Sequence, residues 1–317
     1  MEMTPGLKLP RSPSAVDVIA HHATGTFEPA RPSGVMARSD EFVTVDGIEI
    51  HYSAWGDRAD PTVLCVHGLS RNGRDFDPLA RALEDDYHVV CPDMPGRGLS
   101  QWADDPAERY SNGAMVETLV DLCDTLELDT LRYVGTSMGG GLGMALAGGP
   151  LADRIERLVI NDMPPNPETD SAPEALGRIM EYVPEPPTVE TVTALEEYFR
   201  DLYEGRFSEM TDAEYRRLAV TSARRTDAGR VTAHYDPRIL AGEDDEDAEA
   251  PDPWDVWEAI DAPLLVLRGT DSDILPAEPF ERMIETQPDA ETVEIDCGHA
   301  PALNTPEQID PIRDFFA

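Results

Sequence analysis

Residues 132–149 read RYVGTSMGGGLGMALAGG and gather glycines around a single serine, Ser137. Glycine-rich turns of this kind cradle phosphates, bind dinucleotides or hold a nucleophile on a sharp bend. The stretch lacks the lysine of a phosphate-binding loop. Read from Gly139 or Gly141, it also lacks the final glycine of a dinucleotide-binding pattern. The five residues 135–139, GTSMG, instead fit the pattern G-x-S-x-G.

The residues on either side of Ser137 suit a nucleophile. The run TLRYVG (130–135) predicts a strand that ends at the turn, and SMGGGLGMALAG (137–148) predicts a helix that begins with it. A serine on such a turn adopts a strained backbone conformation that lifts its hydroxyl clear of the sheet, and the flanking glycines let strand and helix pass closely. The first amides of the helix lie near the place where negative charge would form.

Strands and helices alternate through most of the chain. The hairpin expected over residues 41–55 has Asp46-Gly47 as its turn. The alternation that follows predicts a mostly parallel sheet flanked by helices, an α/β fold. One block contains helical segments without a convincing strand, which predicts an inserted lid. The expected organisation is an N-terminal extension (1–40), a first core part (41–163), a helical lid (164–258) and a second core part (259–317).

The net charge of the chain is −38, because it has 63 Asp and Glu residues but only 25 Lys and Arg residues. A field of this sign repels nucleic acids and anionic membranes, so we expect neither as a partner. Like charges also oppose compactness when salt does not screen them. We therefore expect a protein adapted to high salt, with an acidic but ordinary cytosolic protein as the alternative. The acidic run 242–252 favours a solvated loop over a metal site.

Composition also bears on location. No apolar run approaches the roughly 20 residues that span a bilayer, and residues 1–25 show no signal-peptide pattern. The four cysteines are scattered without a C-x-x-C motif, which predicts free buried thiols in a reducing, cytoplasmic environment. The oligomeric state stays open.

A serine nucleophile needs a base, and the base needs an orienting acid. In the order Ser, acid, His along the chain, His299 follows the last predicted strand and is the expected base. The acid is expected after the strand that ends at Gly269. Asp273 is preferred there over Asp271, and Asp162, after the preceding strand, is a third candidate.

The remaining site residues come from loops and from the lid. The backbone amides of Met138 and Leu69 are the expected oxyanion-hole donors, and His67 is expected to be a structural hydrogen-bonding residue. A buried packing role is expected for Cys297. The candidates for the substrate pocket are Tyr182, Tyr203 and His234. Arg224, Arg225 and Arg230 offer a possible carboxylate site, with surface salt bridges as the favoured interpretation.

Several segments together resemble the α/β-hydrolase superfamily, in its lidded branch of esterases, lactonases and meta-cleavage C–C hydrolases. The segments that carry the resemblance include VHGLSRNGRDFDPLA (66–80), VGTSMGGGLGMALA (134–147), LLVLRGTDSDIL (264–275) and GHAPAL (298–303). The resemblance covers about residues 41–317. It implies Ser137 as nucleophile, His299 as base and Asp273 as acid. We expect no cofactor and no metal.

The resemblance implies hydrolysis of a small carboxylic ester through an acyl-enzyme. Two alternatives stay open. One is another hydrolase with the same triad, acting on a C–C bond or a lactone. The other is a small-molecule receptor that keeps the fold with slow or absent turnover.

Overall fold

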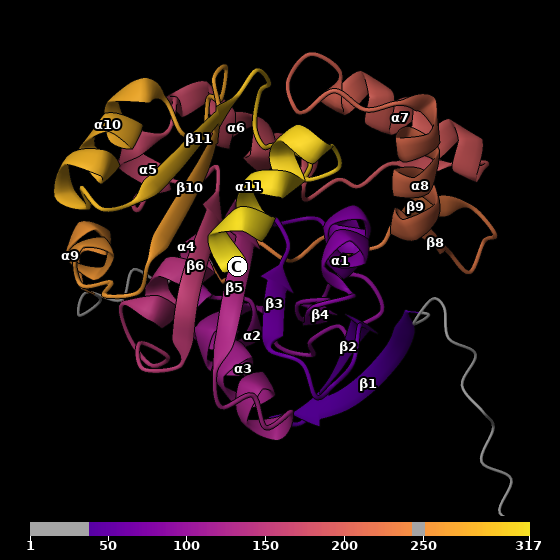
Figure 1. The fold of residues 1–317 in the computed structure, drawn as a ribbon. Coiled ribbons are helices and arrows are strands. Elements are labelled where there is room, and N and C mark those ends of the chain that lie inside the picture. Colours follow the sequence, from indigo (N-terminus) through magenta and orange to yellow (C-terminus); the bar gives the residue numbers. More distant parts are fainter. Residues whose placement is uncertain (1–37, 243–250) are drawn as a thin grey trace, which may run out of the picture. The chain divides into compact units, whose positions relative to one another are not determined.

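A computed structural model of the protein describes residues 38–242 and 251–317 (Figure 1). The predictions for the N-terminal extension up to residue 37 and for most of the acidic run lie outside the described residues. Among the helices within the two described ranges, none combines the length and the apolar character needed to cross a membrane.

An eight-stranded sheet forms the centre of the fold, with the order β1-β2-β4-β3-β5-β6-β10-β11. β1 and β2 pair antiparallel, as do β2 and β4, whereas all later neighbours pair parallel. This confirms the predicted α/β class. The strands are β1 (Ser39–Val45), β2 (Ile48–Trp55), β3 (Thr62–Val66), β4 (His88–Pro92), β5 (Leu131–Thr136), β6 (Ile155–Asn161), β10 (Leu264–Gly269) and β11 (Glu291–Ile295).

The predicted hairpin turn between β1 and β2 is confirmed. Asp46 and Gly47 both have positive φ, at 42° and 77°. A two-residue turn with positive φ at both positions matches the right-handed twist of the strands that it joins. Asparagine, aspartate and glycine tolerate this conformation better than other residues, which is why the Asp-Gly pair predicts the turn.

Helices cover both faces of the sheet because its strands are apolar on both sides. In β3, Val63 and Cys65 belong to one hydrophobic cluster, and Leu64 and Val66 to the other. On the first face pack α1 (Asp77–Leu83) and α11 (Pro306–Phe316); on the second pack α3 (Asn112–Thr125), α4 (Met138–Ala147), α9 (Pro253–Glu258) and α10 (Ala277–Thr286). The short helices η1 (Gly73–Phe76) and α2 (Pro106–Arg109) lie in connections.

The segment predicted as a lid has a hydrophobic cluster of its own, built around Leu195, Phe199, Tyr203 and Leu218. Figure 1 shows α7 and α8 of this segment to one side of the central sheet. Its elements are α5 (Pro167–Asp170), α6 (Pro173–Tyr182), β7 (Thr188–Val189), α7 (Val192–Tyr203), α8 (Asp212–Ser222), β8 (Ala223–Arg225) and β9 (Val231–Ala233).

The segment predicted as a lid differs from the prediction in two respects. It contains a three-stranded sheet, β7-β9-β8, where no strand was expected. Strands of two or three residues are too short to show the alternation that reveals a strand in a sequence. In addition, α9 falls within the predicted lid range but packs with the core, where Trp257 is fully buried and its indole N–H donates to Thr286 Oγ1 at 3.0 Å.

The glycines of α4 allow this helix to lie directly on the sheet. A Cβ atom at Gly139 would overlap the carbonyl oxygen of Val66, and one at Gly143 would lie 2.5 Å from the ring of Tyr133. A Cβ atom at Gly141 would meet only the terminal methyl of Met163, at 3.6 Å. Close packing of helix and sheet therefore requires glycine at positions 139 and 143, but not at 141.

Substituting Gly143 and Gly141 separately tests this packing. Gly143→Ala is expected to lower the free energy of unfolding by about 1–3 kcal/mol, because the added methyl strains a packed core. Gly141→Ala is expected to leave it unchanged or to raise it by about 0.5–1 kcal/mol, because alanine favours a helix. Urea unfolding of both variants measures the difference, and equal effects at the two positions would contradict the packing argument.

Candidate active site

Ser137 lies at the junction of β5 and α4, with φ 54° and ψ −120°. Only a few per cent of non-glycine residues have positive φ, and such a conformation costs on the order of 1–3 kcal/mol. Neighbouring backbone groups hold it: the Ser137 N–H donates to Asn161 O at 2.9 Å, and the Ser137 carbonyl accepts from Gly140 N at 2.7 Å. The strained turn predicted for this serine is therefore present.

His299 follows β11 and joins Ser137 to a carboxylate. Its Nε2 lies 2.9 Å from Ser137 Oγ, and its Nδ1 lies 2.6 Å from Asp162 Oδ2. The side chain is buried, and its ring packs against that of Phe207 at 5.9 Å between centroids. The three side chains form one continuous hydrogen-bonded chain, the geometry of a nucleophile, a base and an orienting acid.

Asp162 comes directly after β6 and is fully buried. Its carboxylate accepts three hydrogen bonds. Oδ1 accepts from Gly269 N at 2.9 Å, and Oδ2 accepts from Ser272 Oγ at 2.7 Å as well as from His299. A carboxylate that accepts several donors is held in one orientation.

The prediction that Asp273 contacts His299 is wrong. The carboxylate of Asp273 instead forms an ion pair with Arg178 of α6 at 2.8 Å, and Asp271 is exposed. The cause lies in the strand order. Because β6 and β10 are neighbours, the residues that follow both strands reach the same edge of the sheet. From the loop after β10, Ser272 contacts Asp162, which was the third candidate for the acid.

The two residues expected to form the oxyanion hole lie beside Ser137. Met138 is the first residue of α4, and Leu69 lines the same cavity as Ser137. A Cβ atom on Gly68 would lie 3.6 Å from the Cβ of Ser137, so the loop after β3 passes close to the serine. The buried side chain of Arg97 links the two residues, because its Nε donates to Leu69 O at 2.9 Å and its Nη2 lies 3.9 Å from Met138 Sδ.

His67 is a structural residue, as predicted. It is fully buried; its Nδ1 bonds to Gly68 O at 2.7 Å, and its Nε2 accepts from Met94 N at 3.0 Å. Burial lowers the pKa of His67 to about 4, so the ring is neutral near pH 7. It therefore fixes the loop that carries Leu69.

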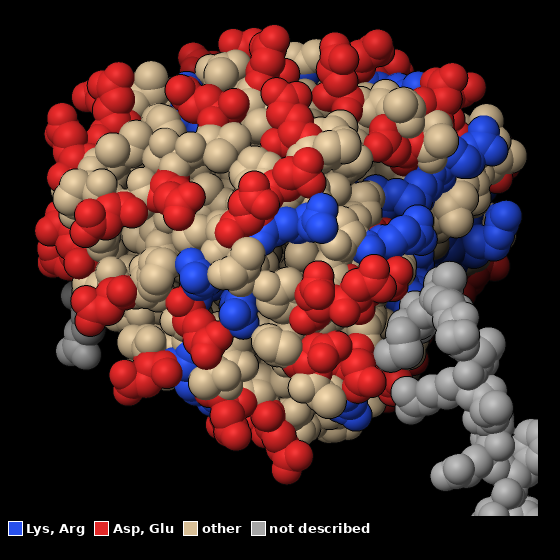
Figure 2. Space-filling model, viewed as in Figure 1, with Lys and Arg blue, Asp and Glu red and all other residues tan. Residues whose placement is uncertain are grey.

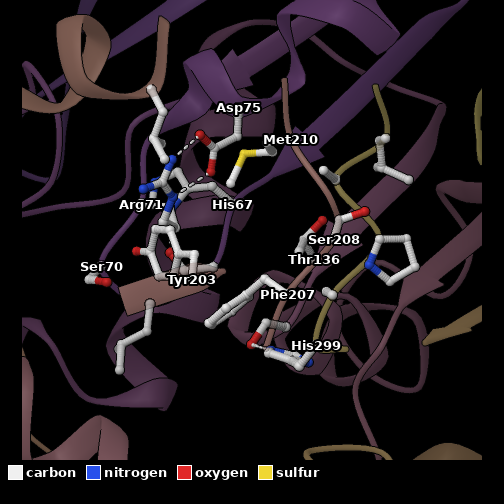
Figure 3. Close-up of a pocket in the computed structure, with 18 of the residues that line it drawn as sticks. His67, Ser70, Arg71, Asp75, Thr136, Tyr203, Phe207, Ser208, Met210 and His299 are labelled. Atoms are coloured by element: carbon white, nitrogen blue, oxygen red, sulfur yellow. Dashed lines mark hydrogen bonds and ion pairs between the residues drawn. The ribbon is translucent and has the colours of Figure 1, made fainter. Parts of the chain in front are cut away.

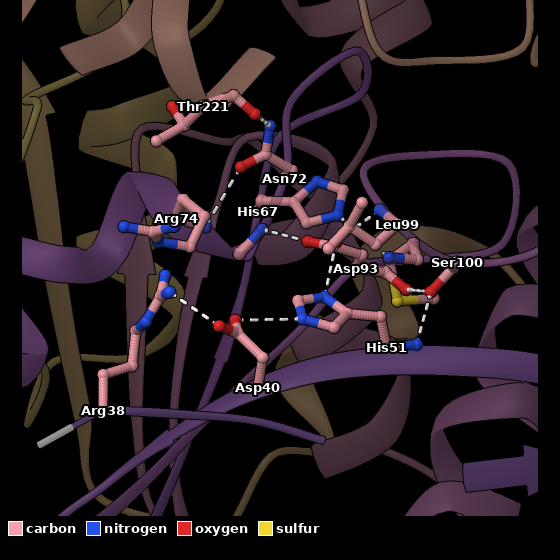
Figure 4. Close-up of polar contacts among 12 residues, drawn as sticks. Arg38, Asp40, His51, His67, Asn72, Arg74, Asp93, Leu99, Ser100 and Thr221 are labelled. Carbon is pink, nitrogen blue, oxygen red and sulfur yellow. Dashed lines mark hydrogen bonds and ion pairs between the residues drawn. The ribbon is translucent and has the colours of Figure 1, made fainter. Parts of the chain in front are cut away.

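A second polar cluster centres on His51 and Asp93 (Figure 4). His51 bonds through Nδ1 to Asp93 at 2.8 Å and through Nε2 to Asp40 at 3.2 Å. His234, predicted for the substrate pocket, lines the hollow beside these residues and does not line the cavity at Ser137. That prediction is wrong, because the backbone of His234 accepts from Gly98 N at 2.8 Å and so anchors it to the loop after β4.

A cavity of about 150 Å³ opens onto Ser137 and His299 (Figure 3). Tyr182 and Tyr203, both predicted for the pocket, line it. Phe207 also lines it. Several other lining side chains were not predicted from the sequence; these are Arg71, Asp75, Ile179, Ser208, Met210, Arg217 and Leu218. Arg71 could have been suspected, since it follows Gly68 by three residues, but no pattern distinguishes Arg217 from the other arginines of residues 164–258.

The arginines that were considered for a carboxylate site do not line this cavity. Arg224 stacks over the ring of Trp102 at 4.5 Å, and Arg225 donates to Gly229 O at 3.1 Å. Arg230 forms an ion pair with Glu190 at 2.5 Å. The surface salt bridges that were the favoured interpretation are therefore present for Arg230, whereas Arg224 and Arg225 make an aromatic contact and a backbone hydrogen bond instead.

The four cysteines are free and buried, as predicted. Burial raises the pKa of the Cys297 thiol to about 12, so it is protonated near neutral pH and is a poor nucleophile. The packing role expected for Cys297 is consistent with this environment. The cytoplasmic location inferred from the cysteines stays a prediction.

Comparison with known proteins agrees with this architecture. The model of the alpha/beta hydrolase family matches residues 63–311. A 3-hydroxybutyrate-oligomer hydrolase from Cupriavidus necator is 38% identical over 275 residues, which cover 84% of this chain and 92% of that protein. The crystal structure of an alpha/beta hydrolase from Novosphingobium aromaticivorans is 34% identical, with a TM-score of 0.79, over 89% of this chain and 99% of that one. Esterase YbfF from Escherichia coli is 38% identical over 103 residues, or 32% of this chain and 39% of that protein.

Proposed function

Because this chain belongs to the alpha/beta hydrolase family, we propose that it is a serine hydrolase that cleaves carboxylic esters through an acyl-enzyme. The hydrogen-bonded chain Ser137–His299–Asp162 is the single observation that carries the proposal. Both distances fall in the range at which a base can take the proton of a nucleophile and an acid can orient the base.

In the proposed reaction His299 Nε2 takes the proton of Ser137 Oγ as the oxygen attacks the ester carbonyl. Asp162 holds the proton of Nδ1, which fixes the tautomer, and stabilises the imidazolium that forms. The same proton then passes from His299 to the leaving alcohol. Water, activated by His299, hydrolyses the acyl-enzyme and restores Ser137.

The amides of Met138 and Leu69 are the proposed donors to the oxyanion. One donor of this kind is typically worth about 3 kcal/mol of the barrier. Both residues lie beside Ser137, and the contacts of Arg97 support their position. The proposal that the α6–α8 segment acts as a lid rests on the cavity residues Tyr182, Tyr203 and Phe207, which this segment supplies.

The name of the Cupriavidus relative suggests a substrate class, a linear oligomer of a short hydroxy acid. The cavity is small and lined largely by apolar side chains, which supports a short aliphatic chain on either side of the ester. The test is hydrolysis of the linear 3-hydroxybutyrate dimer and of short p-nitrophenyl esters. Turnover of a ring-fission dienoate alone would replace the proposal with a C–C hydrolase. A ligand-induced rise in melting temperature without turnover would replace it with a receptor.

We also propose that the protein is adapted to high salt. Figure 2 shows acidic side chains over most of the visible face, whereas most basic ones gather near α8 and β8. At 0.1 M salt the screening length is about 10 Å, so neighbouring carboxylates repel, and at 1 M it is about 3 Å. We expect the melting temperature to rise on the order of 10 °C between 0.1 and 2 M KCl, which corresponds to a few kcal/mol.

Calorimetry in a KCl series measures this effect. Potassium chloride is preferred to a sulfate, because sulfate stabilises most proteins through exclusion from their surface. The same melting temperature at both salt concentrations would contradict the proposed adaptation.

A further inference from the structure

The cavity at Ser137 carries an excess of positive charge in a strongly acidic protein. Outside the triad, the lining contains two arginines, Arg71 and Arg217, and one acidic residue, Asp75, so the formal charge of these side chains near pH 7 is +1. The other lining histidine, His67, is neutral there because burial lowers its pKa to about 4. The chain as a whole has a net charge of −38. The net charge of these lining side chains is therefore opposite in sign to the net charge of the whole chain.

Arg71 is the fixed member of this group. Its Nε and Nη2 donate to the two oxygens of Asp75 at 2.8 and 2.5 Å. Its guanidinium carbon lies 5.8 Å from the ring centre of Tyr203 and 5.9 Å from that of Phe199. Figure 3 shows the paired side chains of Arg71 and Asp75 on the cavity wall beside Tyr203. The carboxylate of Asp75 offsets the charge of Arg71 and locks its orientation.

Arg217 supplies the charge that is not offset. It lies on α8, where its Nη1 donates to Arg74 O at 2.6 Å. Throughout the described part of the chain, no carboxylate lies within ion-pair distance of its guanidinium. A guanidinium has five N–H donors, so this single backbone contact leaves most of them available. The adjacent Arg216, by contrast, pairs with Glu196.

Apolar side chains line the cavity together with the nucleophile and the arginines. Phe207, Met210 and Leu218 line the cavity together with Ser137 and Arg217. In Figure 3, Phe207 lies between His299 and the group formed by Arg71, Asp75 and Tyr203. A ligand that fits this arrangement has a reactive carbonyl, a short aliphatic segment and an anionic end. Apolar surroundings strengthen the attraction between an anion and a guanidinium.

We propose that Arg217, which lines the same cavity as the Arg71–Asp75 pair, binds the free terminal carboxylate of a linear hydroxy-acid oligomer whose ester carbonyl lies at Ser137. The inference rests on the proposed ester hydrolase function and narrows it to acid-terminated substrates. Arg217 is then a specificity-determining residue and takes no part in proton transfer. The positive charge of Arg217 attracts an anion inside the cavity, although the net negative charge of the protein repels the same anion at longer range.

Two substrates that differ only in charge test this inference. One is the linear dimer of 3-hydroxybutyrate, and the other is the same dimer with its terminal carboxylate converted to a carboxamide. For the dimer, Arg217→Gln is expected to lower kcat/KM by about 10- to 100-fold, mainly through KM, because a charge-assisted contact is lost. For the carboxamide, the expected change is within about 2-fold. Arg217→Lys is expected to restore part of the activity on the dimer.

Arg216→Gln is the matched control, since it removes the same charge from the next residue of α8 without changing the cavity wall; it is expected to leave both rates unchanged. An equal loss on both substrates in Arg217→Gln would overturn the inference and assign Arg217 a structural role. An unchanged rate on the dimer would also overturn it. If the wild type cleaves p-nitrophenyl esters but not the dimer, the inference fails and the ester hydrolase proposal stands. If it cleaves no ester, both fail.

Discussion

Ser137→Ala is expected to lower ester hydrolysis by about 10⁴- to 10⁶-fold, because no other group in the proposed mechanism can form the acyl-enzyme. The substitution removes one oxygen and leaves the backbone of the turn in place. The residual rate is expected to come from substrate binding and from the amides of Met138 and Leu69. Hydrolysis of p-nitrophenyl butyrate, followed at a single enzyme concentration, measures the loss.

Two controls separate chemistry from folding. Ser70→Ala changes a second serine that lines the same cavity, and it is expected to retain activity within a few-fold. A reactive alkyl phosphonate should add mass to Ser137 in the wild type and leave Ser137→Ala unlabelled. Substantial turnover by Ser137→Ala, or labelling of another residue, would contradict the assignment of the nucleophile.

Asp162→Asn is expected to lower kcat by about 10⁴-fold. The amide nitrogen of asparagine can donate to His299 Nδ1, which favours the tautomer that has its proton on Nε2. In that tautomer Nε2 can no longer accept the proton of Ser137, from which it lies 2.9 Å away. The amide also replaces a carboxylate that stabilises the imidazolium. The expected loss is therefore in the chemical step rather than in substrate binding.

Asp273→Asn is the matched control for this substitution, because it makes the same chemical change on the neighbouring loop. It breaks the partly exposed ion pair with Arg178, so we expect a loss of no more than about 1 kcal/mol in stability and nearly full activity. Thermal unfolding of both variants shows whether Asp162→Asn is folded. A larger loss of kcat in Asp273→Asn than in Asp162→Asn would contradict the assignment of Asp162 and would identify Asp273 as the acid that orients His299.

The fold and two members of the candidate triad could be predicted because local patterns determine them. The turn at Ser137 needs its glycines, and His299 follows the last strand in a short distinctive segment. The acid could not be predicted because it depends on which of two neighbouring strands ends nearer the imidazole. Both β6 and β10 are followed by aspartates, and the choice between Asp162 and Asp273 depends on three-dimensional packing that includes the hydrogen bond from Ser272.

The lid segment was harder to predict for a different reason. Its strands are only two or three residues long, and two of its helices, α7 and α8, pack on a separate small core. Amphipathic spacing predicts such helices but not which of their ends reach the cavity. Arg217 and Leu218 are adjacent in α8 and both line the cavity. Arg217 supplies the charge that no carboxylate offsets, whereas Leu218 supplies an apolar surface. That distinction depends on the position of α8 beside η1, where Arg217 donates to Arg74 O.

The position of the acid divides the triad unevenly along the chain. Ser137 and Asp162 both precede the inserted segment, whereas His299 follows it, 137 positions after the acid. A ribosome that has made the nucleophile, the acid and the whole insertion has not yet made the base. The growing polypeptide therefore holds an inert serine until β10 and β11 join the sheet. The proposed hydrolase activity can then appear only once the last strands of the central sheet are in place, so its onset during synthesis would report that these strands have joined the sheet.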